Sequence, residues 1–96
     1  MIYEWDPRKA RANLKKHDIT FDEALTVFSD PFALTFDDPD HSADERRLIT
    51  LGLSGKNRIV FLAHADTADD RIRIISARKA TKTKAHAYQE SRKSTR

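Results

Sequence analysis

Cysteine is absent from this chain of 96 residues, so neither a disulfide framework nor a thiolate metal site can hold the fold or take part in its chemistry. The absence suits a reducing compartment. No apolar run approaches the roughly 18 residues that a membrane span needs, and the N-terminus lacks the basic and apolar regions of a signal peptide. We therefore expect a cytoplasmic protein that does not enter a membrane.

Glycine and proline are scarce, with two and three residues, and no internal repeat is found, so nothing marks a boundary between domains. A chain of this length has room for one hydrophobic core. Its mean hydropathy of -0.70 indicates that much of the surface faces water. We expect a single domain over residues 1–90 and a frayed basic tail over residues 91–96.

The net charge is only +3, but the charges are unevenly distributed along the chain. Residues 22–45 include eight acidic residues and no Lys or Arg, whereas residues 71–96 include nine basic residues and one acidic residue. Clustered Lys and Arg bind phosphates through Coulomb attraction and counterion release. The C-terminal part is therefore a candidate polyanion-binding surface. A solvated surface with a basic tail would show the same pattern, and composition leaves both interpretations open.

Local signals predict where the helices begin. Asp6 supplies an N-cap oxygen and Pro7 suits the first helical position. Thr20 and Glu23 form a capping box, in which the Thr20 hydroxyl accepts a hydrogen bond from the backbone N–H of Glu23 and the Glu23 carboxylate reaches back to the cap. A last helix is expected to begin near Ser76. The predicted helices cover residues 7–17, 21–28 and 76–90.

Apolar patterns predict the strands. Phe32, Leu34 and Phe36 recur with a period of two, and the run from Ile59 to Ala63 is apolar on both faces, which is typical of a central strand. The predicted strands cover residues 2–5, 32–36, 45–51, 58–65 and 71–75. This order predicts an α+β fold with one strand, two helices, a four-stranded antiparallel run and a C-terminal helix, with the helices on one side of the sheet.

Several short segments of the chain form a pattern when they are taken together. They are Tyr3-Glu4-Trp5-Asp6, Lys9-Ala10, Asn13-Leu14-Lys15-Lys16-His17, Phe21-Asp22-Glu23-Ala24, Val27-Phe28-Ser29-Asp30-Pro31, Glu45-Arg46-Arg47 before Gly52, Arg58, Arg73-Ile74-Ile75-Ser76-Ala77-Arg78-Lys79-Ala80 and Tyr88. Each segment is short, but their co-occurrence over residues 2–90 is specific, and it resembles the BrnT family of toxins from type II toxin–antitoxin systems. Two residues depart from the family pattern, because Asp18 stands where Gly is common and Lys84 where Glu is frequent.

The resemblance implies a RelE-like fold, cleavage of RNA without a metal or other cofactor, and neutralisation by a BrnA-type ribbon-helix-helix antitoxin. It also implies a hetero-oligomer of toxin and antitoxin, in which operator DNA is contacted only through the antitoxin. Two alternatives from other classes stay open: a nucleic-acid-binding module without chemistry, and a toxin-derived co-repressor subunit. An enzyme acting on small molecules is disfavoured, because the sequence has no Gly-rich phosphate loop or nucleophile motif.

Metal-independent RNA cleavage requires an activated 2′-hydroxyl, stabilisation of the phosphorane charge and a proton for the leaving 5′-oxygen. Arg71 and Arg73 alternate with Ile72 along one strand, so both guanidinium groups should project from the same sheet surface. Arg78 and Lys79 are expected in the first turn of the last helix, where backbone N–H groups assist phosphate binding. An exposed strand face and a solvated helix are the alternative interpretation.

The remaining candidates include the groups that could move protons. Glu45 and Arg47 alternate on one strand face, which permits a network with the arginine-bearing strand or simply a surface ion pair. The His17 imidazole can titrate near neutrality, or it can satisfy carbonyls at a helix end. Lys84 shares a helical phase with Tyr88, and it either contacts phosphate or extends to the solvent.

The candidates fall into two groups, and no metal site is expected. The catalytic candidates are His17, Glu45, Arg47, Arg73 and Arg78, and the RNA-binding candidates are Arg58, Arg71, Lys79 and Lys84.

Overall fold

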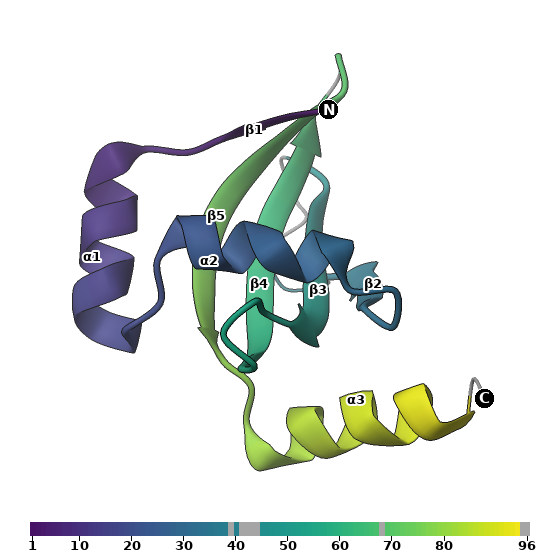
Figure 1. Cartoon of the computed structure of the whole chain (residues 1–96). Helices are drawn as coiled ribbons and strands as arrows, with labels where there is room; N and C mark the ends of the chain where they lie inside the picture. The colour runs from purple at the N-terminus through teal and green to yellow at the C-terminus, as the bar shows by residue number, and fades with distance from the viewer. Residues whose placement is uncertain (39, 41–44, 68, 95–96) are drawn as a thin grey trace.

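A five-stranded mixed β-sheet forms the centre of the protein in a computed structural model that describes residues 1–38, 40, 45–67 and 69–94 (Figure 1). The strands are β1 (Ile2–Glu4), β2 (Leu34–Asp37), β3 (Arg47–Leu53), β4 (Ile59–Thr67) and β5 (Arg71–Lys79). The helices are α1 (Pro7–His17), α2 (Phe21–Leu25), the 3-10 helix η1 (Thr26–Ser29) and α3 (Lys82–Ser94). The predicted α+β class and element order are confirmed.

The strand order is β1-β5-β4-β3-β2. The four-stranded antiparallel run is present, because β2, β3 and β4 each pair antiparallel with the next strand in sequence. Strand β1 joins the other edge, where it pairs parallel with the first three residues of β5. The sheet is therefore mixed, and the pairing of β1 was not predicted from the sequence. Strand β4, which was expected to be central, lies in the middle of the sheet.

One face of the sheet is covered by α1, α2 and η1, and the core lies between the two layers. Alternation along β4 directs Val60 and Leu62 toward these helices, where they pack with Ile19, Phe21 and Ala24. The opposite face of the sheet is called the open face below. Helix α3 lies across the lower end of the sheet in Figure 1, and its Tyr88 side chain is buried.

Strand β5 continues to Lys79, so the helix predicted from Ser76 is wrong. Residues 76–79 pair with β4, and this pairing overrides their helical propensity. The ladder contains a β-bulge, because Ile74 pairs with His64 and Ser76 with Ala63, which leaves Ile75 as the extra residue. Helix α3 extends past the predicted end near residue 90, through residue 94, and residues 95 and 96 lie outside the described range.

The side chain of Asn13 joins α1 to β5 where β1 no longer covers the strand edge. Its Nδ2 donates to the carbonyls of Ile19 at 3.0 Å and Ala77 at 2.8 Å, and its Oδ1 accepts from the N–H of Ala77 at 3.0 Å. Strand β1 pairs only with residues 71–73, so the carboxamide takes the place of a peptide group of the next strand. Asn13 is 6% exposed, and its hydrogen bonds are therefore shielded from water.

Replacing Asn13 with Leu should destabilise the fold, because a side chain of similar size leaves three backbone groups buried without partners. Each such group costs about 1–3 kcal/mol, and we expect a total loss on the order of 3 kcal/mol in the free energy of unfolding, measured by urea denaturation. Leu14→Ala, at an exposed position of the same helix, is the control and should have little effect. Equal stability of Asn13→Leu and the wild type would contradict this role.

Candidate functional site

Two arginines converge on one carboxylate on the open face. Arg47 Nε donates to Glu45 Oε1 at 3.2 Å, and the Arg73 guanidinium donates to the same oxygen. The strand register explains the convergence, because Arg47 and Arg73 both pair with Ala65 from opposite sides. The small Ala65 side chain leaves room above it for both guanidinium groups. The network that the sequence left open for these residues is present, and we call Glu45, Arg47 and Arg73 the arginine–glutamate cluster.

The cluster is partly exposed and its carboxylate is ionised at neutral pH. The side chains of Glu45, Arg47 and Arg73 are 31%, 30% and 40% exposed. Burial alone would raise the pKa of Glu45, but hydrogen bonds from both arginines and their positive charges outweigh it and hold that pKa below its usual range. The carboxylate can therefore accept a proton, and the guanidinium groups can bind an anion that enters from solvent.

Two cation–aromatic pairs lie farther along the open face. The Arg78 guanidinium carbon lies 4.7 Å from the centre of the Phe61 ring, and Lys84 Nζ lies 5.4 Å from that of Phe36. Arg78 is in β5 and not in a helix, so the predicted phosphate clamp at a helix N-terminus is wrong. Arg78 shares the open face with Arg73, roughly 13 Å away along the sheet, because their partners on β4 are four residues apart.

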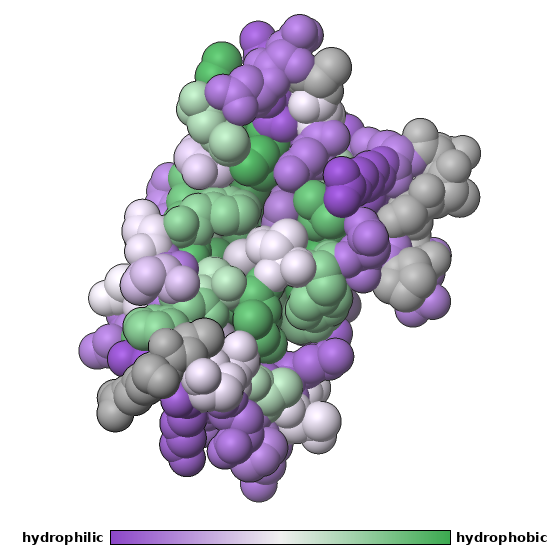
Figure 2. Space-filling model, turned by 90° about the vertical axis from the view of Figure 1, so that its right-hand side faces the viewer, coloured by the Kyte–Doolittle hydropathy of each residue, from purple (hydrophilic) through white to green (hydrophobic). Residues whose placement is uncertain are grey.

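Apolar side chains gather on the side of the molecule where β2 lies, between hydrophilic regions above and below (Figure 2). Phe36 is 39% exposed there, at the edge of the sheet. Arg71 lies at the opposite edge, where its Nη1 contacts Glu4 Oε1 of β1 at 3.0 Å. The open face thus runs from an apolar edge at β2 to an ion-paired edge at β1.

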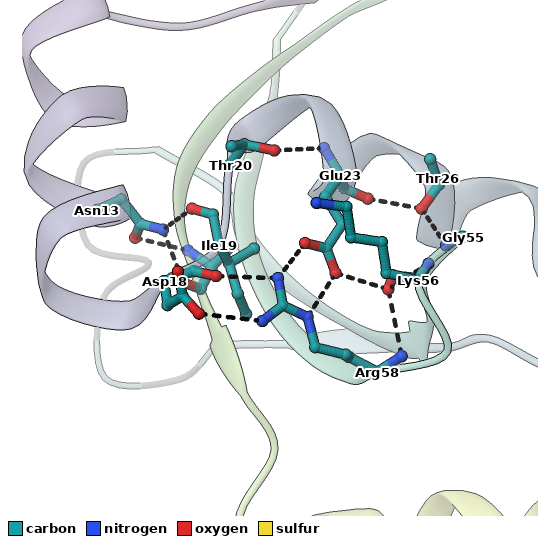
Figure 3. A network of polar contacts seen from close by, with 11 residues as sticks. Asn13, Asp18, Ile19, Thr20, Glu23, Thr26, Gly55, Lys56 and Arg58 are labelled. Atoms are coloured by element: carbon teal, nitrogen blue, oxygen red, sulfur yellow. Dashed lines mark hydrogen bonds and ion pairs between the residues drawn. The ribbon is translucent and has the colours of Figure 1, made fainter.

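Arg58 lies on the helix-covered side of the sheet, away from the arginine–glutamate cluster (Figure 3). Its guanidinium holds both carboxylate oxygens of Glu23, with Nε 2.9 Å from Oε2, and also donates to the carbonyl of Asp18. Ser54 Oγ donates to the same carboxylate at 2.7 Å. The hydrogen bonds from Arg58 are the main reason that the pKa of Glu23 is lowered in spite of its burial.

This network corrects the predicted capping box. Thr20 Oγ1 accepts from the backbone N–H of Glu23 at 3.0 Å as expected, but the Glu23 carboxylate binds Arg58 and Ser54 instead of returning to the cap. A guanidinium offers the carboxylate charge-assisted hydrogen bonds that a backbone N–H cannot match. No local pattern indicates Arg58 as the partner of Glu23, because the two residues are 35 positions apart along the chain.

His17 and Lys79 also lie apart from the cluster. His17 ends α1 on the helix-covered side, and Lys79 occupies the β5 position whose side chain alternates toward that side. The structure therefore brings together Glu45, Arg47 and Arg73, and it places Arg78 and Lys84 along the same face. It separates His17, Arg58 and Lys79 from them.

A chain of polar contacts on the helix-covered face, buried at His64 and Thr50, was missed by the sequence reasoning. Asp66 Oδ1 lies 2.9 Å from His64 Nδ1, and His64 Nε2 lies 2.8 Å from Thr50 Oγ1. Thr50 Oγ1 lies 2.8 Å from Thr35 Oγ1 at the β2 edge. His64 packs edge-on against Phe28 and is 2% exposed. The available signal was the position of His64, in register with the apolar side chains of β4.

The described residues contain no group of three or more His, Asp or Glu side chains placed to hold a metal ion. None of the helices in that part of the chain combines the length and apolar character that crossing a membrane requires.

The fold and the arginine–glutamate cluster define a small α+β domain with a cationic, partly exposed site on a sheet face. The family described as "Ribonuclease toxin, BrnT, of type II toxin-antitoxin system" matches residues 5–84, and the chain belongs to this family. The fold is similar to the crystal structure of the Brucella abortus ribonuclease toxin BrnT, with a TM-score of 0.67 and 24% identity over 85% of this chain and 100% of that chain. No curated protein matches the sequence. Family membership implies an antitoxin partner.

The buried His64 should make stability depend on pH. Burial lowers the pKa of His64 below 6.5, against the opposing hydrogen bond and charge of Asp66. The unfolded chain therefore binds a proton at a higher pH than the folded chain does, and the free energy of unfolding should fall as the pH drops below about 6.5. In urea denaturation over a pH series, His64→Gln should lose part of this dependence. His86→Gln, at an exposed position of α3, should keep it, and identical pH profiles for the two variants would contradict the assignment.

Proposed function

We propose that this protein is a toxin that acts in the cytoplasm as an endoribonuclease and cleaves RNA without a metal ion. The observation that carries the proposal is the convergence of Arg47 and Arg73 on a single oxygen of Glu45, in a chain of the BrnT family. In this interpretation a phosphate of the RNA enters the cluster and takes over the guanidinium groups. The carboxylate that it displaces is then free to act as a base.

The cluster contains the groups that such a reaction requires. The RNA 2′-oxygen forms a bond to phosphorus and transfers its proton to Glu45, while the bond from phosphorus to the 5′-oxygen breaks. Arg47 and Arg73 stabilise the negative charge that develops on the phosphorane, and the leaving oxygen takes a proton from water. The lowered pKa keeps Glu45 deprotonated at neutral pH, the state that a base must have, and its basicity would increase once a phosphate takes over the two arginines. The position of His17 on the other side of the sheet argues against that histidine.

The cation–aromatic pairs support contacts with the rest of the RNA. Arg78 and Lys84 would bind flanking phosphates, and the rings of Phe61 and Phe36 offer surfaces for unpaired bases. Arg71 would add charge at the β1 edge. Arg58 and Lys79 are not part of this proposed interface. Arg58 is paired with Glu23, and the side chains of Arg58 and Lys79 both lie toward the helix-covered side.

One observation favours a second candidate, a nucleic-acid-binding subunit without chemistry. Both guanidinium groups of the cluster are already paired with a carboxylate of the same chain, as they would be in a purely structural network. Lys84, in place of a family Glu, removes a further carboxylate from this side of the protein. A cleavage assay separates the two candidates.

The purified protein should cleave RNA in buffer containing EDTA, and Arg73→Ala should lower the rate about 10²–10³-fold, the typical cost of losing one donor to a developing oxyanion. Arg46→Ala is the matched control, because Arg46 is 71% exposed and pairs with Asp37 outside the cluster, and it should cleave at the wild-type rate. Loss of activity in EDTA would contradict the mechanism. RNA that stays intact with the wild type would favour the binding subunit.

We also propose that the antitoxin is of the BrnA type with a ribbon-helix-helix fold, and that it covers the open face. The basic cluster and the exposed apolar surface near Phe36 lie on neighbouring parts of the molecule, and a partner with acidic and apolar groups would match both. Operator DNA would be contacted only through the antitoxin in the hetero-oligomer. A stable complex of this kind buries about 1,200–2,000 Å² or more.

Reversing one charge on the open face should weaken the complex. Arg78→Glu places a carboxylate where the partner is expected to be acidic, so its dissociation constant for the antitoxin, measured by titration calorimetry, should rise at least about tenfold. Lys82→Glu makes the same charge change at the start of α3 and is the control. If both variants bind as the wild type does, the antitoxin docks elsewhere.

A further inference from the structure

Helix α1 carries an uncompensated positive charge. Its sequence includes five basic residues, Arg8, Lys9, Arg11, Lys15 and Lys16, and no acidic residue. All five are exposed. Because the whole chain has a net charge of +3, the residues outside these five have a net charge of -2. Helix α1 is therefore one of two strongly basic parts of the chain, the other being residues 71–96 with nine basic residues and one acidic residue.

Several other cations of the protein are paired with carboxylates of the chain. Arg58 binds Glu23, Arg71 binds Glu4, and Arg47 and Arg73 share Glu45. On α1 only Arg8 has such a partner, the capping residue Asp6 at 3.5 Å. Within the described part of the chain, the other four have no ion pair or hydrogen bond through their side chains. At the far end of the helix, the nearby acid Asp18 contacts Arg58.

The helix is also held rigidly in place. Its inward side is fixed to β5 by the three hydrogen bonds of Asn13, and its C-terminus is closed by the Asp18 N–H, which donates to the Leu14 carbonyl. The five cations are thus presented on an ordered scaffold, with Leu14 as the only large apolar side chain exposed on α1.

We propose that α1 binds the phosphate backbone of RNA as a second site, separate from the arginine–glutamate cluster. This inference rests on the proposed function, since it assigns α1 to the same RNA. Exposed, flexible Lys and Arg side chains, four of them without a carboxylate partner, suit phosphates better than a protein core. The apolar surface that suits a protein partner lies at β2, whereas α1 lies beside β5, toward the other edge of the sheet.

The position of α1 determines which RNA molecules can contact both the helix and the arginine–glutamate cluster. The helix lies on the covered side of β5, and the arginine–glutamate cluster lies on the open side of the same strand. An RNA must pass around the β1 edge to contact both. A long or folded RNA can do so, whereas a fragment of a few nucleotides in the cluster cannot. The second site should therefore raise affinity for long RNA and leave the reaction itself unchanged.

The test compares two triple variants that remove the same number of lysines. Lys9, Lys15 and Lys16 are replaced by Gln in one variant, and Lys56, Lys82 and Lys93 in the other. Binding of 2′-O-methyl RNA, which has no free 2′-hydroxyl and cannot be cleaved, is measured by fluorescence anisotropy against salt concentration. Each phosphate contact contributes about 0.7–0.9 to the slope of log K against log salt. The α1 variant should lose about 2–3 from this slope, and the control should lose far less.

Cleavage of a short oligonucleotide should be unaffected by the α1 variant, while KM for a long RNA should rise at least about tenfold. Equal losses in the two triple variants would show only a diffuse charge effect and overturn the proposal. So would wild-type binding in the α1 variant, or a defect confined to antitoxin binding. If the wild type binds RNA through α1 but does not cleave it, the proposal of a second binding site is supported and the proposed nuclease function is contradicted.

Discussion

The three hydrogen bonds of Asn13 support both sides of the molecule. Strand β1 covers only the first residues of β5, and beyond them the strand edge would be open to water or to another chain. Asn13 closes this edge with its carboxamide and attaches α1 in the same place. The arginine–glutamate cluster depends on β5 from the open side, and the basic surface of α1 depends on it from the covered side.

The charges of this protein differ in whether they are already neutralised. Glu23 is buried, and hydrogen bonds from Arg58 and Ser54 engage both of its carboxylate oxygens, which is the arrangement that makes a buried ion tolerable. Glu45 has a similar set of partners but is about one-third exposed, so an anion from solvent can compete for its arginines. The lysines of α1 have no competitor within the described chain. The Glu23–Arg58 pair, the arginine–glutamate cluster and the basic residues of α1 thus contain similar residue types. They differ mainly in how far their side chains are exposed to solvent.

The local parts of the fold could be predicted from sequence, and the distant partnerships could not. Asp6 and Pro7 define the start of α1, because capping depends on neighbouring residues. The end of β5 was missed, because residues 76–79 are held by pairing with β4 rather than by their own propensity. For the site, alternation correctly grouped Glu45 with Arg47, but only the strand register shows that Arg73 joins them. Nothing nearby in the sequence indicates the partners of Glu23 or His64.

The bulge at Ile75 determines which faces of the sheet Arg73 and Arg78 occupy. Arg73 and Arg78 are five positions apart, and in a regular strand an odd separation would direct them to opposite faces. The extra residue restores the phase, so both arginines lie on the open face. Deletion of Ile75 would keep both arginines on the open face. If Ile75 were instead paired with β4 as a regular strand residue, the Arg78 side chain would point into the core. The extra residue at Ile75 therefore determines whether Arg78 faces the solvent or the helices.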